Sequence, residues 1–186
     1  MIKVPDVGRF VVGLALVAGT MCAPVRADDC VTGAPTPMFS AARRDIPAHA
    51  FQRKSAHEAI ERFRLGPDVQ VRVAHGGCEY VVAKFRFESP GLFANSHADG
   101  LAYEQAAALL GRLKALRPER DFDFDLGLAG KTLLQAARRK RPPGLGEELH
   151  VRGDGVAPLE AVLQVEAAGR RGASGYLEVS LFRGPL

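Results

Sequence analysis

The sequence predicts an α+β fold in which an antiparallel sheet of four to six strands carries two or three helices packed on one face, held by one disulfide. Three observations support this prediction. Alternating apolar and polar segments flank a Gly-Gly pair, apolar residues recur at helical spacing after them, and alternation returns in the C-terminal third. Because helical and alternating segments are partly segregated, α+β is favoured over a parallel α/β arrangement.

The composition is that of one folded domain rather than a disordered or strongly charged chain. Of the 186 residues, 47% are hydrophobic and 25% are charged, a balance that supports a buried core. Residues 1–27 hold three basic side chains and one acidic one, so residues 28–186 carry 22 basic and 20 acidic side chains, a net charge of +2. This near-neutral charge argues against nucleic-acid binding, which usually needs a strong basic excess.

Residues 1–27 have the pattern of a cleavable secretory signal peptide. Two basic residues precede an apolar run from Phe10 to Ala23, which is too short to span a bilayer as a permanent helix. Val-Arg-Ala then provides a cleavage site after Ala27. We therefore predict export to the bacterial periplasm, with secretion beyond the cell left open, and no transmembrane anchor after cleavage.

Two cysteines remain in the single α+β domain expected over 28–186. Cys30 lies in a Pro-rich segment, 28–39, that we expect to be extended, and Cys78 begins a predicted strand. An even pair in an oxidising compartment favours a disulfide, which would close a loop of about 50 residues and contribute about 4 kcal/mol at most. A catalytic or metal-binding thiol pair is the weaker alternative, since no CxxC spacing is present, and we expect no cofactor and no metal.

In chain order, the first predicted element is a helix beginning at Ser55. Ser-Ala-His-Glu at 55–58 has the form of a capping box, and Ile60 and Phe63 continue an apolar repeat at helical spacing. Gly66-Pro67 is the expected end of this helix.

A β-hairpin follows and is the clearest element of the sequence. Residues 68–75 and 78–88 both alternate apolar and polar side chains, and Gly76-Gly77 between them suits a tight turn. The side chains expected to point inward from the second strand are Val81, Ala83, Phe85 and Phe87.

The middle of the chain predicts two more helices separated by a short strand. A loop over 89–100 leads to a helix from Leu101 to Arg117 with a broad apolar face. Asp-Phe-Asp-Phe-Asp-Leu at 121–126 alternates and predicts a strand. The next helix is expected from Leu128 to Arg141, and its basic end, 138–141, suits the negative end of the helix dipole.

The C-terminal third predicts three strands, at 148–152, 159–166 and 174–182, with 169–172 linking the last two. Pro158 is acceptable at the start of a strand but also suits the start of a helix. A helix over 158–168 is therefore the alternative for that segment.

Two features are candidates for partner contact: the 89–100 loop and the acidic alternation at 121–125. Carboxylates on one face of a strand can meet a basic partner or a hard cation, although the glycine and bidentate glutamate of a calcium loop are absent. A solvated edge that discourages strand pairing is the plainest interpretation. The candidate partner-contact residues are Phe93, His97, Asp121, Asp123 and Asp125.

No catalytic motif is present. The five histidines include no HExxH or HxH pair, and no GxSxG sequence occurs. Ser96, His97 and Asp99 have the residue types of a catalytic triad, but residues this close in one loop rarely converge as a triad requires. Catalytic residues therefore stay unassigned.

These observations predict an exported, non-enzymatic binding protein with a protein partner in the cell envelope. An inhibitor or immunity-type protein that acts on an envelope enzyme is the sharpest form of this hypothesis, and it rests on architecture alone. The alternatives are a periplasmic hydrolase whose site is assembled from distant residues, and a structural component of the envelope.

Overall fold

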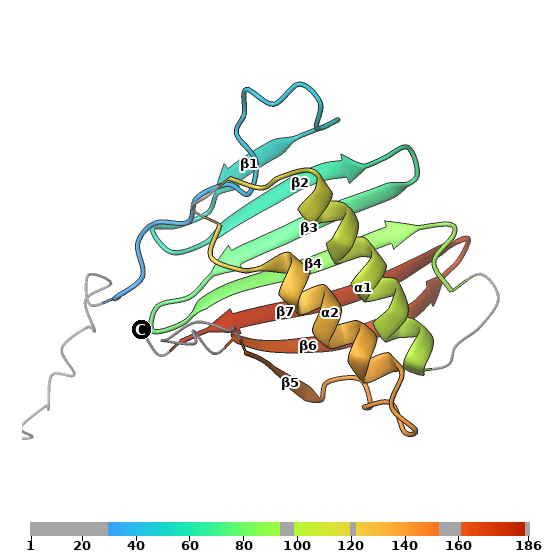
Figure 1. The fold of residues 1–186 in the computed structure, drawn as a ribbon. Helices are drawn as coiled ribbons and strands as arrows, with labels where there is room; N and C mark the ends of the chain where they lie inside the picture. The colour runs from blue at the N-terminus through green and yellow to red at the C-terminus, as the bar shows by residue number, and fades with distance from the viewer. Residues whose placement is uncertain (1–29, 94–98, 120–121, 153–160, 185–186) are drawn as a thin grey trace, which may run out of the picture.

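The protein has one seven-stranded antiparallel sheet with two helices on one face, as Figure 1 shows for the computed structural model. The structure describes residues 30–93, 99–119, 122–152 and 161–184. The strands are β1 (Ala50–Arg53), β2 (Ala59–Leu65), β3 (Val69–Gly76), β4 (Val81–Ser89), β5 (Glu148–Val151), β6 (Ala161–Arg171) and β7 (Ser174–Arg183), and the helices are α1 (Asp99–Ala115) and α2 (Leu126–Ala137). The predicted α+β class is confirmed, with seven strands in place of four to six.

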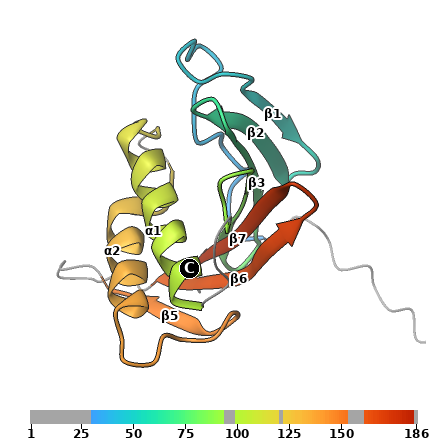
Figure 2. The same ribbon diagram turned by 90° about the vertical axis from the view of Figure 1, so that its right-hand side faces the viewer.

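The sheet consists of two antiparallel meanders joined side by side. Its strand order is β1-β2-β3-β4-β7-β6-β5, so β4 at the end of the first meander pairs with β7 at the end of the second. The helices lie between the meanders in sequence and pack together on one face, as the edge-on view in Figure 2 shows. Both edge strands, β1 and β5, have only four residues, which limits pairing with other chains.

The face that carries the helices, called the covered face below, holds the core. Alternate residues of the central strands point into it, as predicted: Val69, Val71 and Val73 from β3, Ala83, Phe85 and Phe87 from β4, and Leu177, Val179 and Leu181 from β7. The helices pack against β5, β6 and β7. Segment 30–49 covers the β2 end, where the Phe39 and Phe63 rings meet edge to face with centroids 5.0 Å apart.

The helix predicted from Ser55 is wrong, because residues 59–65 form strand β2. Ser55 does not cap a helix; its Oγ accepts a hydrogen bond from the His57 N–H at 3.2 Å in the turn between β1 and β2. Ala59, Glu61, Phe63 and Leu65 are buried in strict alternation. Glu61 is a charged residue at an inward position, so the period-two pattern is not visible as an alternation of apolar and polar residues. The three-residue spacing of Ile60 and Phe63 is also compatible with a helix.

The strand predicted at 121–126 is also wrong. None of residues 122–125 is in a strand, and Asp125 is the N-cap of α2, where its carboxylate accepts from the N–H groups of residues 127 and 128. The expected helix over 128–141 therefore begins at Leu126, and it ends at Ala137. An Asp before an apolar helical repeat is an N-cap pattern that competes with alternation, and in this segment the cap prevails.

The predicted turns differ in length from the observed ones, whereas the strands they join are confirmed. The β3–β4 turn covers 77–80 rather than Gly76-Gly77 alone. Strands β6 and β7 continue to a two-residue connection at 172–173, with Gly172 at φ 61°, so the expected link at 169–172 is too long. Within its described part, 161–168 is strand, and the helical alternative is wrong there.

The predicted disulfide between Cys30 and Cys78 is confirmed, with 4.6 Å between the Cα atoms. It ties segment 30–49 to the β3–β4 turn, and the Thr32 N–H donates to the Cys78 carbonyl at 3.1 Å beside it. The predicted signal peptide at 1–27 lies outside the described residues. Of the helices the structure describes, none has the length and apolar character needed to cross a membrane.

Candidate functional site

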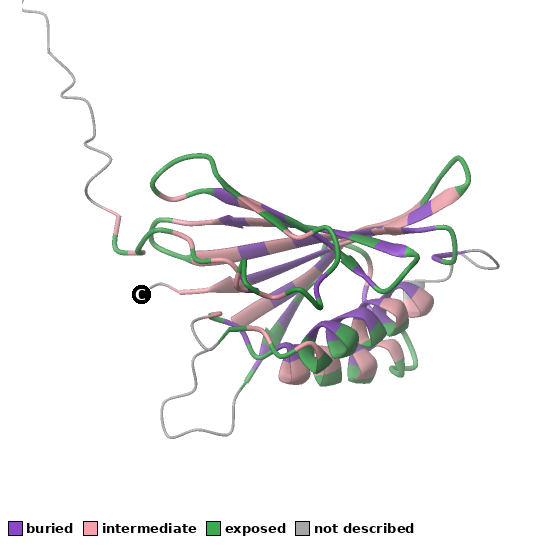
Figure 3. Cartoon of the chain, turned by 90° about the horizontal axis from the view of Figure 1, so that it is seen from above, coloured by how far each residue is buried: buried purple, intermediate pink, exposed green. Residues whose placement is uncertain are grey.

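The open face of the sheet, opposite the helices, is strongly charged. Seen from above in Figure 3, the helices lie on one side only, and exposed residues alternate with buried ones along the strands. The exposed outward residues are Arg62 and Arg64 in β2 and Gln70 and Arg72 in β3. Their neighbours in sequence are core residues, so the strand period places these arginines on the open face.

Three arginines stand in a row across neighbouring strands. Arg72 of β3 is the register partner of Arg62 on β2 and of Arg86 on β4. Register partners in adjacent antiparallel strands have Cβ atoms about 5 Å apart, and like charges placed directly opposite destabilise a sheet. The row is therefore unfavourable for folding.

Two more arginines extend the row into a patch. A hollow of about 660 Å³ on this face is lined by Ala48, Arg62, Phe63, Arg64, Gln70, Val71, Arg72, Arg86, Glu88 and Arg171. We call Arg62, Arg64, Arg72, Arg86 and Arg171 the arginine patch. Among the described residues, Arg62, Arg64, Arg72 and Arg171 form no ion pair, so the hollow has a net positive charge.

In the other half of the open face, formed by β4, β6 and β7, basic side chains are paired with carboxylates. Lys84 of β4 pairs with Glu166 of β6 and lies 3.8 Å from Glu178 of β7. Arg86, at the border of the two halves, is held by Glu178 at 2.5 Å and by Glu88 at 2.6 Å. The sheet thus pairs the cations of β4 with carboxylates, while no carboxylate of the described residues pairs with the exposed arginines of β2 and β3.

Among the described residues, the covered face holds one buried carboxylate, Glu61, and both of its oxygens accept hydrogen bonds. The Glu61 side chain is 0% exposed and accepts from the Met38 and Phe39 N–H groups at 2.7 and 3.1 Å. His49 Nε2 lies 2.7 Å from one carboxylate oxygen and His75 Nε2 lies 3.0 Å from the other. Because an ionised carboxylate only accepts, each Nε2 carries a proton.

Three of these four donors lower the pKa of Glu61. Burial alone would raise it, but the hydrogen bonds from His75, from the Met38 N–H and from His49 outweigh burial and hold the pKa of Glu61 below its ordinary value. The carboxylate therefore stays ionised and fastens segment 30–49 to β2. Since both imidazoles are hydrogen-bonded to Glu61, we assign this cluster a structural role.

The contact residues predicted in the 89–100 loop contribute little surface where the structure describes them. Phe93 has φ 54°, is only 2% exposed and belongs to the core, as do Leu92 and Tyr103 nearby. Arg170 Nη1 donates to the Leu92 carbonyl at 3.0 Å and fixes this segment against the β6–β7 hairpin. His97, with Ser96 of the triad hypothesis, lies outside the described residues, so contact through His97 stays a prediction.

The three predicted aspartates do not share one strand face. Asp123 pairs with Arg183 Nη2 at 2.5 Å, and Asp125 is exposed and caps α2. Asp121 lies outside the described residues. Partner contact through these carboxylates stays a prediction, but the two that are described already form an ion pair (Asp123) and a helix cap (Asp125) within the fold.

The arginine patch is not predicted from the sequence, although part of its pattern is present there. The alternation of the predicted hairpin puts Arg72 and Arg86 on its polar sides, but Arg62 and Arg64 fall in a segment predicted to be a helix. The alternation of 61–65 is the signal of a strand, and pairing it antiparallel with 69–73 places Arg62 opposite Arg72. Arg171 enters the patch through the tertiary fold alone.

Neither a metal centre nor a relative provides further guidance. In the described ranges, no three His, Cys, Asp or Glu side chains gather in a way that could hold a metal ion. Comparison of the chain with protein families, with curated proteins and with solved structures finds no match. The arginine patch is therefore the strongest candidate site among the described residues.

Proposed function

We propose that this protein is an exported binding protein of the bacterial periplasm that takes an acidic protein partner on its arginine patch. The observation that carries the proposal is the row of Arg62, Arg72 and Arg86 in direct register on the uncovered face of the sheet. Such an arrangement opposes folding, so a partner that supplies the missing carboxylates offers the physical reason for it.

The chemistry of the patch favours carboxylates. A guanidinium group donates two parallel hydrogen bonds to a carboxylate, which adds geometric specificity to charge attraction. The cations repeat about 5 Å apart across the strands, because neighbouring strands are separated by about that distance. An acidic surface with closely spaced Asp and Glu side chains matches this spacing, and Arg rather than Lys is the residue enriched at protein interfaces.

Export supports the location. The predicted leader at 1–27 sends the chain out of the cytosol, and the disulfide Cys30–Cys78 suits an oxidising compartment. An inhibitor or immunity-type protein that covers an acidic envelope enzyme is the sharpest version of the proposal. The hydrolase and structural-component alternatives gain no support from the described residues.

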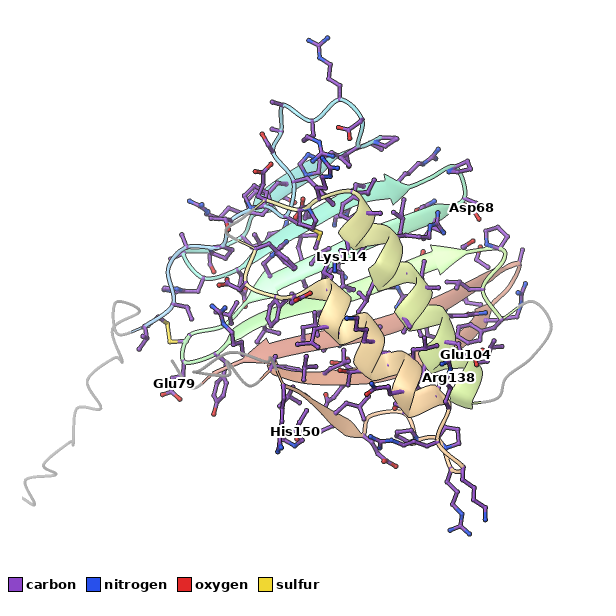
Figure 4. The ribbon with its side chains drawn as sticks, in the orientation of Figure 1. Asp68, Glu79, Glu104, Lys114, Arg138 and His150 are labelled. Atoms are coloured by element: carbon purple, nitrogen blue, oxygen red, sulfur yellow. A yellow bond between two sulfur atoms is a disulfide. The ribbon has the colours of Figure 1, made fainter. Side chains whose placement is uncertain are left out.

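The test compares two variants that remove the same charge from different places. Arg62→Gln with Arg72→Gln takes two charges from the patch. Arg138→Gln with Arg139→Gln takes two exposed charges from the C-terminal end of α2, where Figure 4 labels Arg138 on the helix layer. The probe is a fluorescent deca-glutamate peptide, titrated at two salt concentrations and followed by anisotropy.

We expect the patch variant to bind the peptide about tenfold more weakly than the unaltered protein, since each lost charge-assisted hydrogen bond contributes about 1 kcal/mol or more. The α2 variant should stay within about twofold, and salt should weaken all binding. Equal losses in both variants would mean that only net charge matters. No binding to the peptide, together with capture of phosphatidylglycerol vesicles, would identify a membrane ligand and overturn the protein partner.

The same variants then serve to find the partner in envelope extract. A genuine partner is retained by the unaltered protein and by the Arg138→Gln, Arg139→Gln variant, and is lost with Arg62→Gln, Arg72→Gln. An extract in which every retained protein ignores the patch substitutions would count against the proposal.

A further inference from the structure

A run of four basic residues lies in the connection between α2 and β5. All four side chains are exposed: Arg138, Arg139, Lys140 and Arg141. The sequence predicts this run at the end of a helix, where cations stabilise the helix dipole, but α2 ends at Ala137 and its last turn holds no basic residue. The dipole effect falls off within the last turn, so it accounts for the charge of the C-cap, Arg138, better than for the three residues after it.

The charge of this run is not neutralised within the described part of the chain. No carboxylate there forms an ion pair with any of the four cations. The next acidic residues along the chain have other partners. Glu147 Oε1 accepts from the Gly144 N–H at 2.9 Å, and Glu148 Oε1, at an open-face position of β5, accepts from Gln164 Nε2 at 3.4 Å. Residues 138–141 therefore present four positive charges to solvent.

An exposed apolar side chain follows in the same connection. Leu145 is 41% exposed and is one of three exposed large apolar side chains among the described residues. It is the second residue of a turn in which the Glu147 N–H donates to the Gly144 carbonyl at 3.2 Å. Gly146, the third residue, has φ 84°, as a type II turn requires at that position. The turn thus places Leu145 at its outer corner.

This turn is fixed to both layers of the fold. The Tyr103 hydroxyl of α1 donates to the Gly144 carbonyl at 2.9 Å, and the Gly146 N–H donates to the Val165 carbonyl of β6 at 2.8 Å. The four residues from Arg141 to Leu145 span about 14 Å at most, so the cations and Leu145 form one surface. We call residues 138–145 the basic turn. In Figure 1 this connection lies at the lower end of the molecule beside β5, at the opposite edge of the sheet from β1 and β2.

The form of the basic turn favours a membrane surface over a protein. Residues 138–141 are neither helix nor strand, so their cations lack the regular spacing that would match a set of carboxylates. A standard protein interface also needs about 800 Å² from each partner, more than a turn of eight residues with one exposed apolar side chain provides. An anionic bilayer offers continuous negative charge to clustered cations and accepts an apolar side chain at the boundary between headgroups and acyl chains.

We infer that the basic turn is a peripheral contact for an anionic phospholipid bilayer. Its four cations meet the headgroup phosphates, and Leu145 enters the boundary below them. The inference goes beyond the proposed function and does not depend on it, because the arginine patch lies on the open face of the first meander. A chain held to a membrane by the basic turn keeps that patch available for its protein partner.

The experiment measures cosedimentation with vesicles of pure phosphatidylcholine and with vesicles of equal parts phosphatidylcholine and phosphatidylglycerol. Each cation near an anionic membrane raises the affinity by a factor of about five. Arg138→Gln with Arg139→Gln should therefore bind the mixed vesicles about 30-fold more weakly. Lys140→Gln with Arg141→Gln, which leaves the helix cap unchanged, should lose as much. Leu145→Ser should bind about fivefold more weakly, since less apolar surface is buried in the bilayer.

The matched control is Arg62→Gln with Arg72→Gln, which removes the same charge from the arginine patch. It should change vesicle binding by less than about twofold, because salt screens charges beyond about 8 Å at physiological ionic strength. Pure phosphatidylcholine vesicles measure binding through apolar contacts alone, including any from a leader still attached, and should bind all variants equally weakly.

Three results would overturn the inference. The first is equal binding of the unaltered protein to neutral and mixed vesicles, and the second is a loss in the arginine-patch variant as large as that in the basic-turn variants. The third is loss of the deca-glutamate peptide with retained vesicle binding in Arg138→Gln, Arg139→Gln, which would identify an acidic protein as the occupant. Leu145→Ser that binds the mixed vesicles as tightly as the unaltered protein would contradict the entry of Leu145 into the bilayer.

Discussion

The two faces of the sheet treat charge in opposite ways. On the covered face, Glu61 is fully buried and receives four hydrogen bonds, two from backbone N–H groups and two from histidines. On the open face, Arg72 is exposed and its register partners on both sides are arginines. Both residues lie in adjacent strands of the same meander, so the difference arises from the face and not from the region of sequence.

The contrast follows from the free energy of an unpaired charge, which is much less favourable in the core than in water. An unpaired charge in a low-dielectric core is so unfavourable that the fold must satisfy it. An unpaired charge in water costs about 1 kcal/mol or less, even beside a like charge, because the solvent screens it. The open face can therefore retain unpaired arginines for binding at little cost to stability, whereas the covered face can retain Glu61 only with a complete set of partners.

The largest expected effect compares two residues that are neighbours in β4. Phe85 is 0% exposed on the covered face and Arg86 is on the open face. Phe85→Ala should lower the free energy of unfolding by about 3 to 5 kcal/mol, because it removes buried apolar surface and leaves a cavity. Arg86→Ala should lower it by about 1 kcal/mol or less. Urea unfolding of both variants measures the difference, and similar losses would mean that the open face is buried in solution.

The next effect compares two glutamates. Glu61→Gln should destabilise the protein by about 3 kcal/mol, since an amide cannot accept from two imidazole N–H groups and two backbone N–H groups at once. Glu88→Gln, which weakens a partly exposed pair with Arg86, should cost about 0.5 kcal/mol. Equilibrium unfolding at neutral pH checks both. A loss for Glu61→Gln no larger than that for Glu88→Gln would show that the buried cluster is not ionised.

Most of this fold can be predicted from the sequence where apolar residues repeat with one clear period, either that of a strand or that of a helix. Strand β3 alternates throughout, β4, β6 and β7 alternate over most of their length, and α1 and α2 repeat apolar residues at helical spacing, so local pattern and burial largely agree. The disulfide follows from two cysteines and a leader. Strand β1 has no alternation to detect, since it lies at the edge and three of its four residues are exposed.

The parts that could not be predicted depend on tertiary contacts. Glu61 occupies an inward position because segment 30–49 and two histidines supply its partners, and none of these is near it in sequence. The arginine patch depends on strand register, which pairs residues ten or more positions apart. A site made by register is invisible to motif analysis, so the predicted contact residues fell in a loop and a connection instead.

Lowering the pH should reduce the stability contributed by Glu61 on the covered face more than that contributed by Glu166 on the open face. The pKa of Glu61 is lowered below its ordinary value of 4.5, so its contribution to stability is present at neutral pH and is lost as the pH falls below about 4.5 through the folded-state value. The pKa of Glu166 on the open face is also lowered, through Lys84 and Ser180 against the effect of burial, but its side chain is 25% exposed. The stability gap between the unaltered protein and Glu61→Gln should therefore narrow from pH 6 to pH 3 more than the gap for Glu166→Gln. Unfolding curves across that range check this, and a constant Glu61 gap would contradict it.

The smallest expected effect has the opposite sign. Arg72→Gln removes two like-charge pairs at once, with Arg62 and with Arg86, and should stabilise the protein by about 0.5 kcal/mol. Arg72→Glu should stabilise it further by turning both contacts into attractive pairs, and high salt should reduce both gains. The same substitutions should weaken binding of the deca-glutamate probe, with Arg72→Glu the weaker binder. Stability that rises while binding falls is what a row kept for recognition requires. If Arg72→Gln instead lowered stability, the row would have a structural partner, and the physical reason for proposing the patch as a binding site would be removed.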